Sequence, residues 1–248
     1  NVPLQDGKQG VDVTYIKEGK LHRVRARQSI MAGYNMMIPY MVPEMAEPQK
    51  EALRQNVKAP LVYTKVVIKN WQSFVKLGVH EVYSPAAPYS RVKLDYPVNL
   101  GGYEHPKNPD QPMCLHMVYV PTLPGSGLSA REQSRKGRAM ILGMPFEQHE
   151  QMIREQLQGM LGGAGFNHEQ DILAITVNRW SHGYSYITNT LFDDEEQCDK
   201  WIELGRQPVG NITIANSDSD WSPYAHSAID QAWRAVNELV AMHKGGAK

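Results

Sequence analysis

The sequence predicts a mixed fold of the α/β and α+β classes, with strands and helices alternating along 248 residues. Near the N-terminus, hydrophobic and polar residues alternate, which predicts a β-hairpin. In the middle, apolar β-branched runs are separated by proline and glycine, which predicts antiparallel strands with helices on one face. The end of the chain predicts a strand, a polar turn and an amphipathic helix.

The N-terminal segment is typical of a hairpin followed by a strand. Residues 11–16 alternate in polarity, residues 17–20 form a Lys-Glu-Gly-Lys turn, and residues 21–27 alternate back. Residues 29–33 then predict a buried strand that ends in two small residues, Ala32 and Gly33. An ordinary β-meander with a small-residue turn is the alternative interpretation.

The middle of the chain alternates between helix and strand. From about Asn35 the chain leaves the first sheet, because Pro39, Pro43 and Pro48 break regular structure. Pro145 favours the start of a long helix, and the glycines at 159–165 favour its end. Helices are predicted at 49–55 and 145–161, and strands at 60–68, 79–83, 91–100, 113–120 and 171–180.

The C-terminal segment carries the most specific pattern. Residues 210–220 form a short β-branched strand and a polar turn, and a helix follows from Ala225 to about Ala241. The free N–H groups and the dipole at the start of a helix favour an anion or a carbonyl oxygen. This unit is therefore suited to binding a phosphate or a polyol.

The residues of this segment resemble a known signature. Ile214-Ala215-Asn216-Ser217, then Trp221-Ser222-Pro223-Tyr224-Ala225-His226-Ser227 and Arg234-Ala235, resemble the C-terminal FAD motif of the flavin amine oxidase family. That family includes monoamine and polyamine oxidases. His226 and Ser227 stand where the family has Glu-Gly. Within the family, most of the chain is similar to the bacterial spermidine dehydrogenase type.

The resemblance implies the C-terminal part of a two-domain flavin amine oxidase fold. In this division, 1–38 is a return segment of a Rossmann-like FAD domain, 39–205 is a mixed-sheet substrate domain, and 206–248 is the closing strand and helix of the FAD domain. Asp218, nearest the strand end, is preferred over Asp220 as the partner of a ribityl hydroxyl, with a solvated loop acid as the alternative. The cofactor-binding residues implied by the family are Ala32, Gly33, Ser217, Asp218, Trp221, Tyr224, Ala225 and His226.

The same resemblance implies an amine site with aromatic walls. Trp180 and Tyr224 match the two family aromatics that orient an amine at the flavin face, although core packing is the commoner role of such a cluster. The substrate-binding residues are Trp180, His182, Tyr184, Tyr186 and Tyr224. Lys65 is the candidate for a family lysine near the flavin, but alignment puts Thr64 at that position, and side chains alternate along a strand. An exposed strand lysine is the alternative.

One expected element is missing. No Gly-x-Gly-x-x-Gly sequence occurs in the chain, although this turn lets a backbone approach the FAD pyrophosphate. The chain also opens at Asn1 without methionine. We therefore expect an N-terminal FAD-binding segment or a separate subunit as a partner, so that this chain belongs to a heteromer or is a processed product.

The expected function is FAD-dependent oxidation of an amine C–N bond by hydride transfer to the flavin, with a polyamine such as spermidine as substrate. The alternatives are a same-fold flavoprotein with another substrate, such as an amino-acid oxidase or a desaturase-like enzyme, and a non-catalytic subunit. Heme is a possible second cofactor, because some spermidine dehydrogenases carry it. No Cys-x-x-Cys-His motif occurs, so covalent c-type attachment within this chain is excluded. The electron acceptor is not predicted.

Composition excludes some classes of partner and ligand. Lysine plus arginine and aspartate plus glutamate both number 26, so the net charge is zero. This gives no electrostatic reason to bind nucleic acid or an anionic membrane. No apolar run is long enough to predict a membrane span.

Cys114 and Cys198 lack metal-site spacing, so no metal is expected; two free thiols are favoured, and a disulfide stays open. The resemblance implies a bacterial protein, and both periplasm and cytoplasm stay open because no signal is visible.

Overall fold

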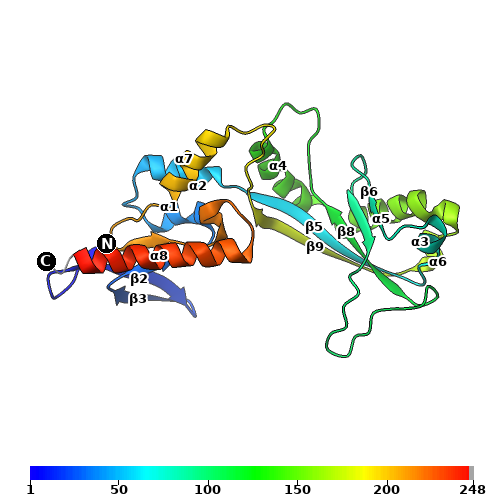
Figure 1. Ribbon diagram of the computed structural model, residues 1–248, viewed down its shortest axis with the longest axis horizontal. Helices are drawn as coiled ribbons and strands as arrows, with labels where there is room; N and C mark the ends of the chain where they lie inside the picture. Colours follow the sequence, from blue (N-terminus) through cyan, green and yellow to red (C-terminus); the bar gives the residue numbers. More distant parts are fainter. Residues whose placement is uncertain (246–248) are drawn as a thin grey trace. The chain divides into compact units, whose positions relative to one another are not determined.

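The computed structural model describes residues 1–245 and divides into two compact units (Figure 1). The first unit contains residues 1–57 and 184–248, and the second contains residues 58–183. The predicted boundaries fell at 38/39 and 205/206, so residues 39–57 and 184–205 lie with the first unit. Which segments serve the cofactor and which the substrate stays a prediction.

A twisted hairpin begins the first unit. Strands β2 (Gln9–Lys17) and β3 (Lys20–Ala26) pair antiparallel, as predicted, and the short β1 (Val2–Pro3) pairs with β2. On one hairpin face, Asp12 binds the guanidinium of Arg25 at 2.7 Å, and the paired Ile16 and Leu21 lie farther along it, each 74% exposed. The opposite face carries Val13, Tyr15 and Val24, each 40% or more exposed.

A second small sheet lies in the same unit. Strands β4 (Ser29–Met31) and β10 (Ile212–Ile214) run parallel, and Thr213 pairs with Ile30. The β10 residues are all buried, but Ile30 is 41% exposed. The prediction of a buried strand at 29–33 was therefore wrong in its burial, because Ile30 is exposed and Ser29 and Met31 are only partly buried.

Helices surround these strands. The longest, α8 (Ala225–Gly245), packs Ala235 and Leu239 inward and extends the predicted helix by one turn. Asp194 caps α7, because its carboxylate accepts the N–H of Gln197 at 3.0 Å. The other helical segments of this unit are η1 (Asn35–Met37), α1 (Ile38–Met41), α2 (Glu47–Gln55), α7 (Glu195–Gly205) and η3 (Ser217–Asp220).

The second unit is built on a five-stranded sheet in the order β6-β7-β8-β5-β9. Its strands are β5 (Lys58–Ile68), β6 (Glu81–Tyr83), β7 (Arg91–Leu94), β8 (Met113–Tyr119) and β9 (Ile172–Ser185), the last of which runs on into the first unit. The strand predicted at 91–100 was too long. Pro97 lacks a backbone donor, and Gly101 and Gly102 turn the chain with positive φ angles.

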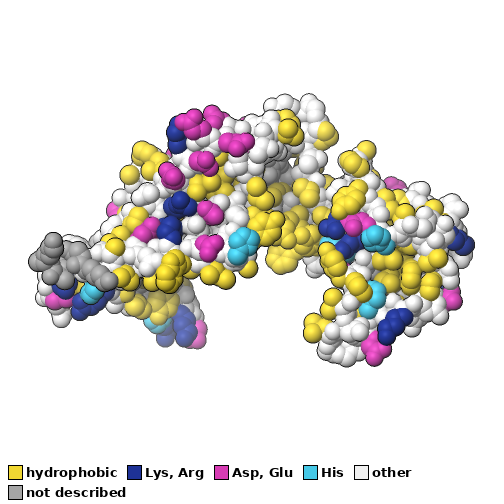
Figure 2. All heavy atoms as spheres, viewed as in Figure 1, with side chains coloured by type: hydrophobic (Ala, Val, Ile, Leu, Met, Phe, Trp, Pro, Cys, Tyr) yellow, Lys and Arg dark blue, Asp and Glu magenta, His cyan; other side chains and the backbone are white. Residues whose placement is uncertain are grey.

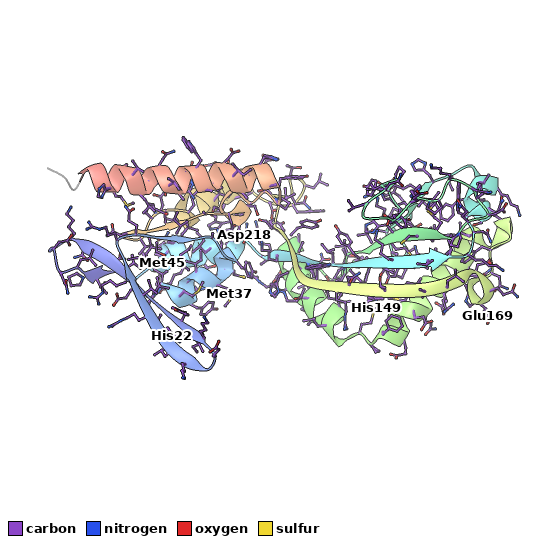
Figure 3. All side chains as sticks on the ribbon, turned by 90° about the horizontal axis from the view of Figure 1, so that it is seen from below. His22, Met37, Met45, His149, Glu169 and Asp218 are labelled. Atoms are coloured by element: carbon purple, nitrogen blue, oxygen red, sulfur yellow. The ribbon has the colours of Figure 1, made fainter. Side chains whose placement is uncertain are left out.

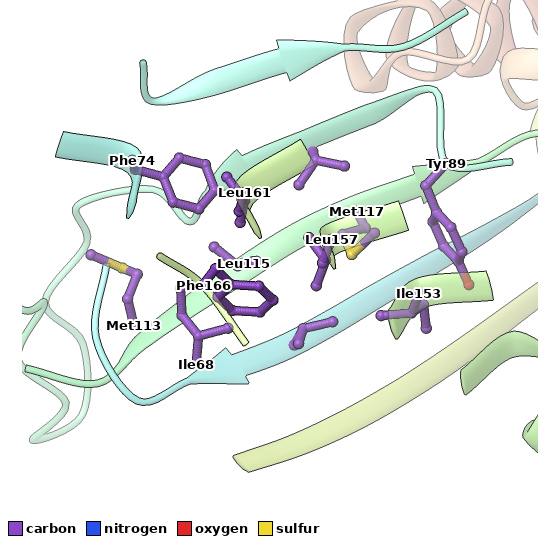
Figure 4. Close-up of a cluster of buried hydrophobic side chains, with 12 residues drawn as sticks. Ile68, Phe74, Tyr89, Met113, Leu115, Met117, Ile153, Leu157, Leu161 and Phe166 are labelled. Atoms are coloured by element: carbon purple, nitrogen blue, oxygen red, sulfur yellow. The ribbon is translucent and has the colours of Figure 1, made fainter. Parts of the chain in front are cut away.

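One face of this sheet forms the core of the second unit. Alternate residues of β5 and β8 point toward α5 (Phe146–Leu161), whose Ile153, Leu157 and Leu161 are fully buried (Figure 4). Phe146, at the start of this helix, is 45% exposed. The remaining helical segments are α3 (Gln72–Leu77), α4 (Ala130–Gly143), η2 (Gly162–Ala164) and α6 (His168–Asp171). No helix within residues 1–245 is long and apolar enough to cross a membrane.

Candidate functional site

The carboxyl ends of β4 and β10 meet because the two strands run parallel. The N–H of Ala215 donates to the carbonyl of Met31 at 2.8 Å. Just beyond, the side-chain amide of Asn216 donates to the carbonyl of Gly33. Ala32 and Gly33 are exposed, and a Cβ added at Gly33 would meet no atom within 4 Å. Ligands of open α/β sheets bind outside this end of the strands, so two small, open residues suit a close approach.

Asp218 lies beneath this edge and is buried, with 1% exposure (Figure 3). Its carboxylate accepts the backbone N–H of Asn35 at 3.2 Å. Its own N–H donates to the side-chain oxygen of Asn216 at 2.6 Å, and its carbonyl accepts the amide of Asn56 at 3.3 Å. Asp218 therefore joins the loops after β4 and β10. Its predicted contact with a ribityl hydroxyl stays a prediction.

The start of α8 presents exposed rings. Tyr224 is 57% exposed, and its ring stacks on that of His226, with centroids 5.5 Å apart and planes 16° apart. The hydroxyls of Ser222 and Ser227 lie 2.7 Å apart and fasten the turn to the helix. Ala225 is exposed beside them. An exposed ring on a fixed helix start can stack against a planar or cationic ligand.

Trp221 and Tyr186 instead belong to a buried aromatic cluster. Their rings meet edge to face, with centroids 5.9 Å apart, and Trp201 stacks on Trp221 at 6.3 Å. The Tyr186 hydroxyl donates to Asp193 at 2.7 Å. Both side chains therefore support the first unit from within, and their predicted contacts with cofactor or substrate stay predictions. Tyr184, two residues earlier on β9, is 44% exposed.

Trp180 and His182 lie on β9 within the second unit, whereas Tyr184, Tyr186 and Tyr224 lie in the first. The Trp180 ring is 54% exposed. Burial lowers the pKa of His182, and the nearby positive charges of Arg138 and Lys58 lower it further. His182 is therefore held toward its neutral form. The cage formed by Trp180 and Tyr224 stays a prediction.

Lys65 lies on the open face of the second sheet. Its ammonium contacts the carboxylate of Asp95 at 2.5 Å. Burial alone would raise the pKa of Asp95, but hydrogen bonds from Lys65 and from the N–H of Tyr96 outweigh it and leave the pKa lowered. Thr64, next along β5, faces the core and is fully buried beside the Tyr89 hydroxyl at 3.3 Å. The expected alternation of these two side chains is confirmed.

Four acidic residues whose carboxylates could bind ammonium groups of a substrate already have partners within this chain. Glu81 binds Arg91, Asp95 binds Lys65, and Asp193 accepts both the Tyr186 hydroxyl and the N–H of Asn189. Asp194 is the cap of α7. Among the described residues, no group of three or more His, Cys, Asp or Glu side chains is placed to hold a metal ion, and Cys114 and Cys198 are free thiols.

We call the loops at the carboxyl ends of β4 and β10 the strand-end site. The sequence analysis did not identify its asparagines. Asn35, Asn56 and Asn216 supply most of its side-chain hydrogen bonds. Asn216 adopts a φ of 74°, in the left-handed region that asparagine tolerates better than most residues. The bend at Asn216 could have been predicted from the sequence, because an asparagine follows the β-branched strand 212–214 almost directly.

Comparison with solved structures identifies the fold. A structure of putrescine oxidase bound to putrescine matches 93% of this chain and 46% of its own, with a TM-score of 0.60 and 14% identity. Cyclohexylamine oxidase from Brevibacterium oxydans IH-35A matches 94% of this chain and 46% of its own, with a TM-score of 0.61 and 10% identity. A protein from Exiguobacterium sp. 255-15, provisionally described as a protoporphyrinogen oxidase, matches 93% and 46%, with a TM-score of 0.59 and 10% identity.

The chain thus has a mixed α/β fold that matches about half the length of flavin amine oxidase chains. No protein-family model matches the sequence, and no curated protein matches it. The expected fold class is confirmed. The finer resemblance to spermidine dehydrogenase stays a prediction.

Proposed function

We propose that this chain is part of an FAD-dependent amine oxidase or dehydrogenase. The observation that carries the proposal is the parallel strand edge of the first unit, where Ala32 and Gly33 leave open space beside Asn216 and Ser217. This edge occurs in a fold that matches enzymes named for putrescine and cyclohexylamine. At such low identity the likeness concerns the fold, so cofactor and reaction are our inference.

The residues at this edge fit a flavin nucleotide. Ala32 and Gly33 would let the cofactor approach the backbone, and Ser217 and the start of α8 would offer polar groups to its ribityl chain. Asp218 would hold the loop of Asn35 in place from below. Bound FAD would supply the hydride acceptor, while the protein supplies orientation and exclusion of water.

The exposed rings would position the amine. Tyr224 and Trp180 each present an aromatic face, and such a face attracts a cationic amine by about 0.5–2 kcal/mol. A polyamine such as spermidine is the first substrate to test. The second candidate is an amino acid, because Glu81 and Asp95, which could have held remote ammonium groups, are already paired with Arg91 and Lys65.

The proposal includes a partner that supplies the dinucleotide-binding turn, either as a further segment of the same polypeptide or as a separate subunit. The open edge of β4 supports this. The outer edge of β10 is closed, since Val209 bridges Ile212 and Arg234 donates to the carbonyl of Ile214. In β4, the backbone groups of Ser29 and Met31 form hydrogen bonds with β10 and the residues beside it. The N–H and C=O of Ile30 therefore point away from β10. Parallel sheets are normally larger and covered, so a further strand fits here.

The exposed face of α8 also supports a partner. Ile229, Trp233, Val236 and Val240 follow a helical spacing and are between 43% and 72% exposed. Figure 2 shows hydrophobic side chains along this helix. An unburied apolar stripe of this length is typical of a surface that another element covers.

The proposed function is tested by tagging the gene and purifying the polypeptide that contains these residues from its natural host. We expect bound FAD that is reduced anaerobically by spermidine or putrescine. Reduction by amino acids alone would favour the second candidate. A colourless protein would indicate a non-catalytic subunit and would remove the proposal.

A further inference from the structure

Four polar residues form a row across adjacent strands of the second unit, on the sheet face opposite its core. The register pairs Glu81 of β6 with Lys93 of β7. It also pairs Lys93 with His116 of β8, and His116 with Lys65 of β5. Directly paired residues place their side chains on one face, about 5 Å apart at Cβ. Figure 2 shows basic, acidic and histidine side chains gathered over β6 and β8.

The two outer members of the row are paired and the two inner members are not. Glu81 binds Arg91, and Lys65 binds Asp95. Lys93 is only 5% exposed, yet within residues 1–245 its ammonium forms no salt bridge. Its described contacts are both with Tyr96: the ring centroid lies 3.0 Å away, and a side-chain hydrogen bond between the two residues lowers the pKa of Tyr96.

His116 also has a ring nitrogen that forms no hydrogen bond. Its Nδ1 is buried and has no hydrogen-bond partner. Buried polar atoms are usually satisfied, and a buried cation without an anion is costly. An unsatisfied ring nitrogen on His116 and a buried ammonium without a salt bridge on its directly paired neighbour Lys93 therefore indicate a ligand that can accept from both.

We propose that Lys93 and His116 form a binding site for an oxyanion, such as the carboxylate or phosphate group of a small molecule. The ammonium of Lys93 would donate from one side, and His116 would donate through Nδ1–H from the other. The neighbouring charges cancel in pairs, Arg91 with Glu81 and Lys65 with Asp95, which leaves the charge of Lys93 to attract the anion.

A pocket lies farther along the same face, and neither Lys93 nor His116 lines it. Val67 and Cys114 pair with each other two residues along from Lys65 and His116, so their side chains share that face. Together with the loop at 103–112 they line a pocket of about 380 Å³. Burial raises the pKa of the Cys114 thiol, so that it stays protonated and does not repel an anion. Tyr96 is 60% exposed and covers Lys93, so that rotation of its side chain would open the site.

The test is calorimetric titration of the full chain with inorganic phosphate, acetate and 4-aminobutanoate at constant ionic strength in chloride-free buffer. We expect saturable one-to-one binding. Preference for phosphate would identify a phosphate ligand, and preference for the two carboxylates would identify a carboxylate ligand. Lys93→Met should weaken binding at least about tenfold, because it removes a charge-assisted donor. Lys136→Met, the same change at an exposed lysine of α4, should bind like the parent.

Thermal unfolding gives an independent readout. A ligand that binds only the folded state raises its melting temperature with concentration, so phosphate or acetate should stabilise the parent and the Lys136→Met variant but not Lys93→Met. If Lys93→Met does not fold, the ¹⁵N resonance of His116 Nδ1 in the parent should still shift saturably with the anion. Absence of binding, or equal binding by the folded Lys93→Met variant, would overturn the site. The site needs no flavin, so a colourless chain that binds the anion would contradict only the proposed function.

Discussion

At the scale of single residues, the strand-end site depends on a few polar side chains that hold backbone in place. Asn216 bends the chain at a φ of 74° and binds both the loop at Gly33 and the N–H of Asp218. Asp218 then fixes the N–H of Asn35 from a fully buried position. A buried donor that loses its acceptor keeps the full cost of its desolvation. These contacts therefore determine the shape of the edge at which we place the cofactor.

The first prediction concerns Asp218. Asp218→Ala should destabilise the chain by about 1.5–3 kcal/mol, because the charged acceptor of a buried N–H is removed. It should also weaken FAD retention on dialysis. Urea unfolding and cofactor content are the measurements. Asp220→Ala is the matched control, since its ion pair with Arg206 is half-exposed and should contribute no more than about 1 kcal/mol. Equal behaviour of the two variants would contradict the role of Asp218.

The second prediction concerns the ring at the start of α8. Tyr224→Ala should slow flavin reduction by an amine about a hundredfold, because a poorly oriented substrate reacts that much more slowly. FAD binding should change far less. Tyr224→Phe keeps the ring and should react close to the parent rate. Stopped-flow flavin reduction by spermidine measures this, and a Tyr224→Ala rate within about twofold of the parent would remove Tyr224 from the amine site.

The third prediction concerns His149, which points from α5 into the second unit (Figure 3). It is fully buried, and its Nδ1 lies 3.3 Å from the Tyr89 hydroxyl. Burial lowers the pKa of His149, and the positive charge of Arg179 lowers it further. The unfolded chain therefore binds a proton first, and stability is lost as pH falls below about 6.5, the ordinary histidine pKa.

Urea unfolding at several pH values between neutral and acidic measures this loss. His116 and His182 also have lowered pKa values, so the parent should lose stability through all three residues. His149→Gln should lose measurably less stability over the same range. An identical pH dependence in parent and variant would show that His149 does not contribute.

At the scale of elements, the unpaired edge of β4 is the feature to which we propose that a further strand binds. Ile30 is the central residue of β4, and its backbone N–H faces away from β10. A proline is tolerated in a strand where its missing N–H would face solvent, but not where it would bond a neighbour. This difference allows the edge to be tested without disturbing the chain itself.

The fourth prediction follows from that difference. Ile30→Pro should leave the folding of this chain nearly unchanged but should reduce flavin content in the protein purified from its host, because an added strand could no longer bond at that position. Met31→Pro, which removes an N–H directed at β10, should unfold the small sheet. Circular dichroism and flavin absorbance are the measurements. Full flavin content in Ile30→Pro would show that no strand is added at β4.

Elements with strong periodicity could be predicted from sequence, and elements defined by distant contacts could not. The hairpin, β5, α5 and α8 follow from their alternation or helical spacing. The exposure of Ile30 depends on which strands flank β4, which no local pattern encodes. In the candidate site, the resemblance to the family named Ala32, Gly33 and Tyr224, which are exposed, and their contacts with a ligand stay predictions. The burial of Trp221 and Tyr186 could not, because it depends on Trp201 and on a turn far along the chain.

At the scale of the whole molecule, the chain matches about half the length of the enzymes whose fold it shares. The strand-end loops, the exposed start of α8 and the open edge of β4 all lie in the first unit. The second unit supplies a separate polar sheet face with Lys93 and His116 at its centre. A cofactor held partly by this chain and partly by a dinucleotide-binding segment accounts for the features of the first unit together.

The most direct test is the absorbance spectrum of the polypeptide that contains these residues, tagged and purified from its natural host, before and after anaerobic addition of spermidine. We predict a flavin band near about 450 nm that bleaches with the amine, together with peptides carrying a Gly-x-Gly-x-x-Gly turn in the same preparation. A colourless preparation, or a flavin band that neither amines nor amino acids reduce, would contradict the assignment as a flavin-dependent amine-oxidising enzyme.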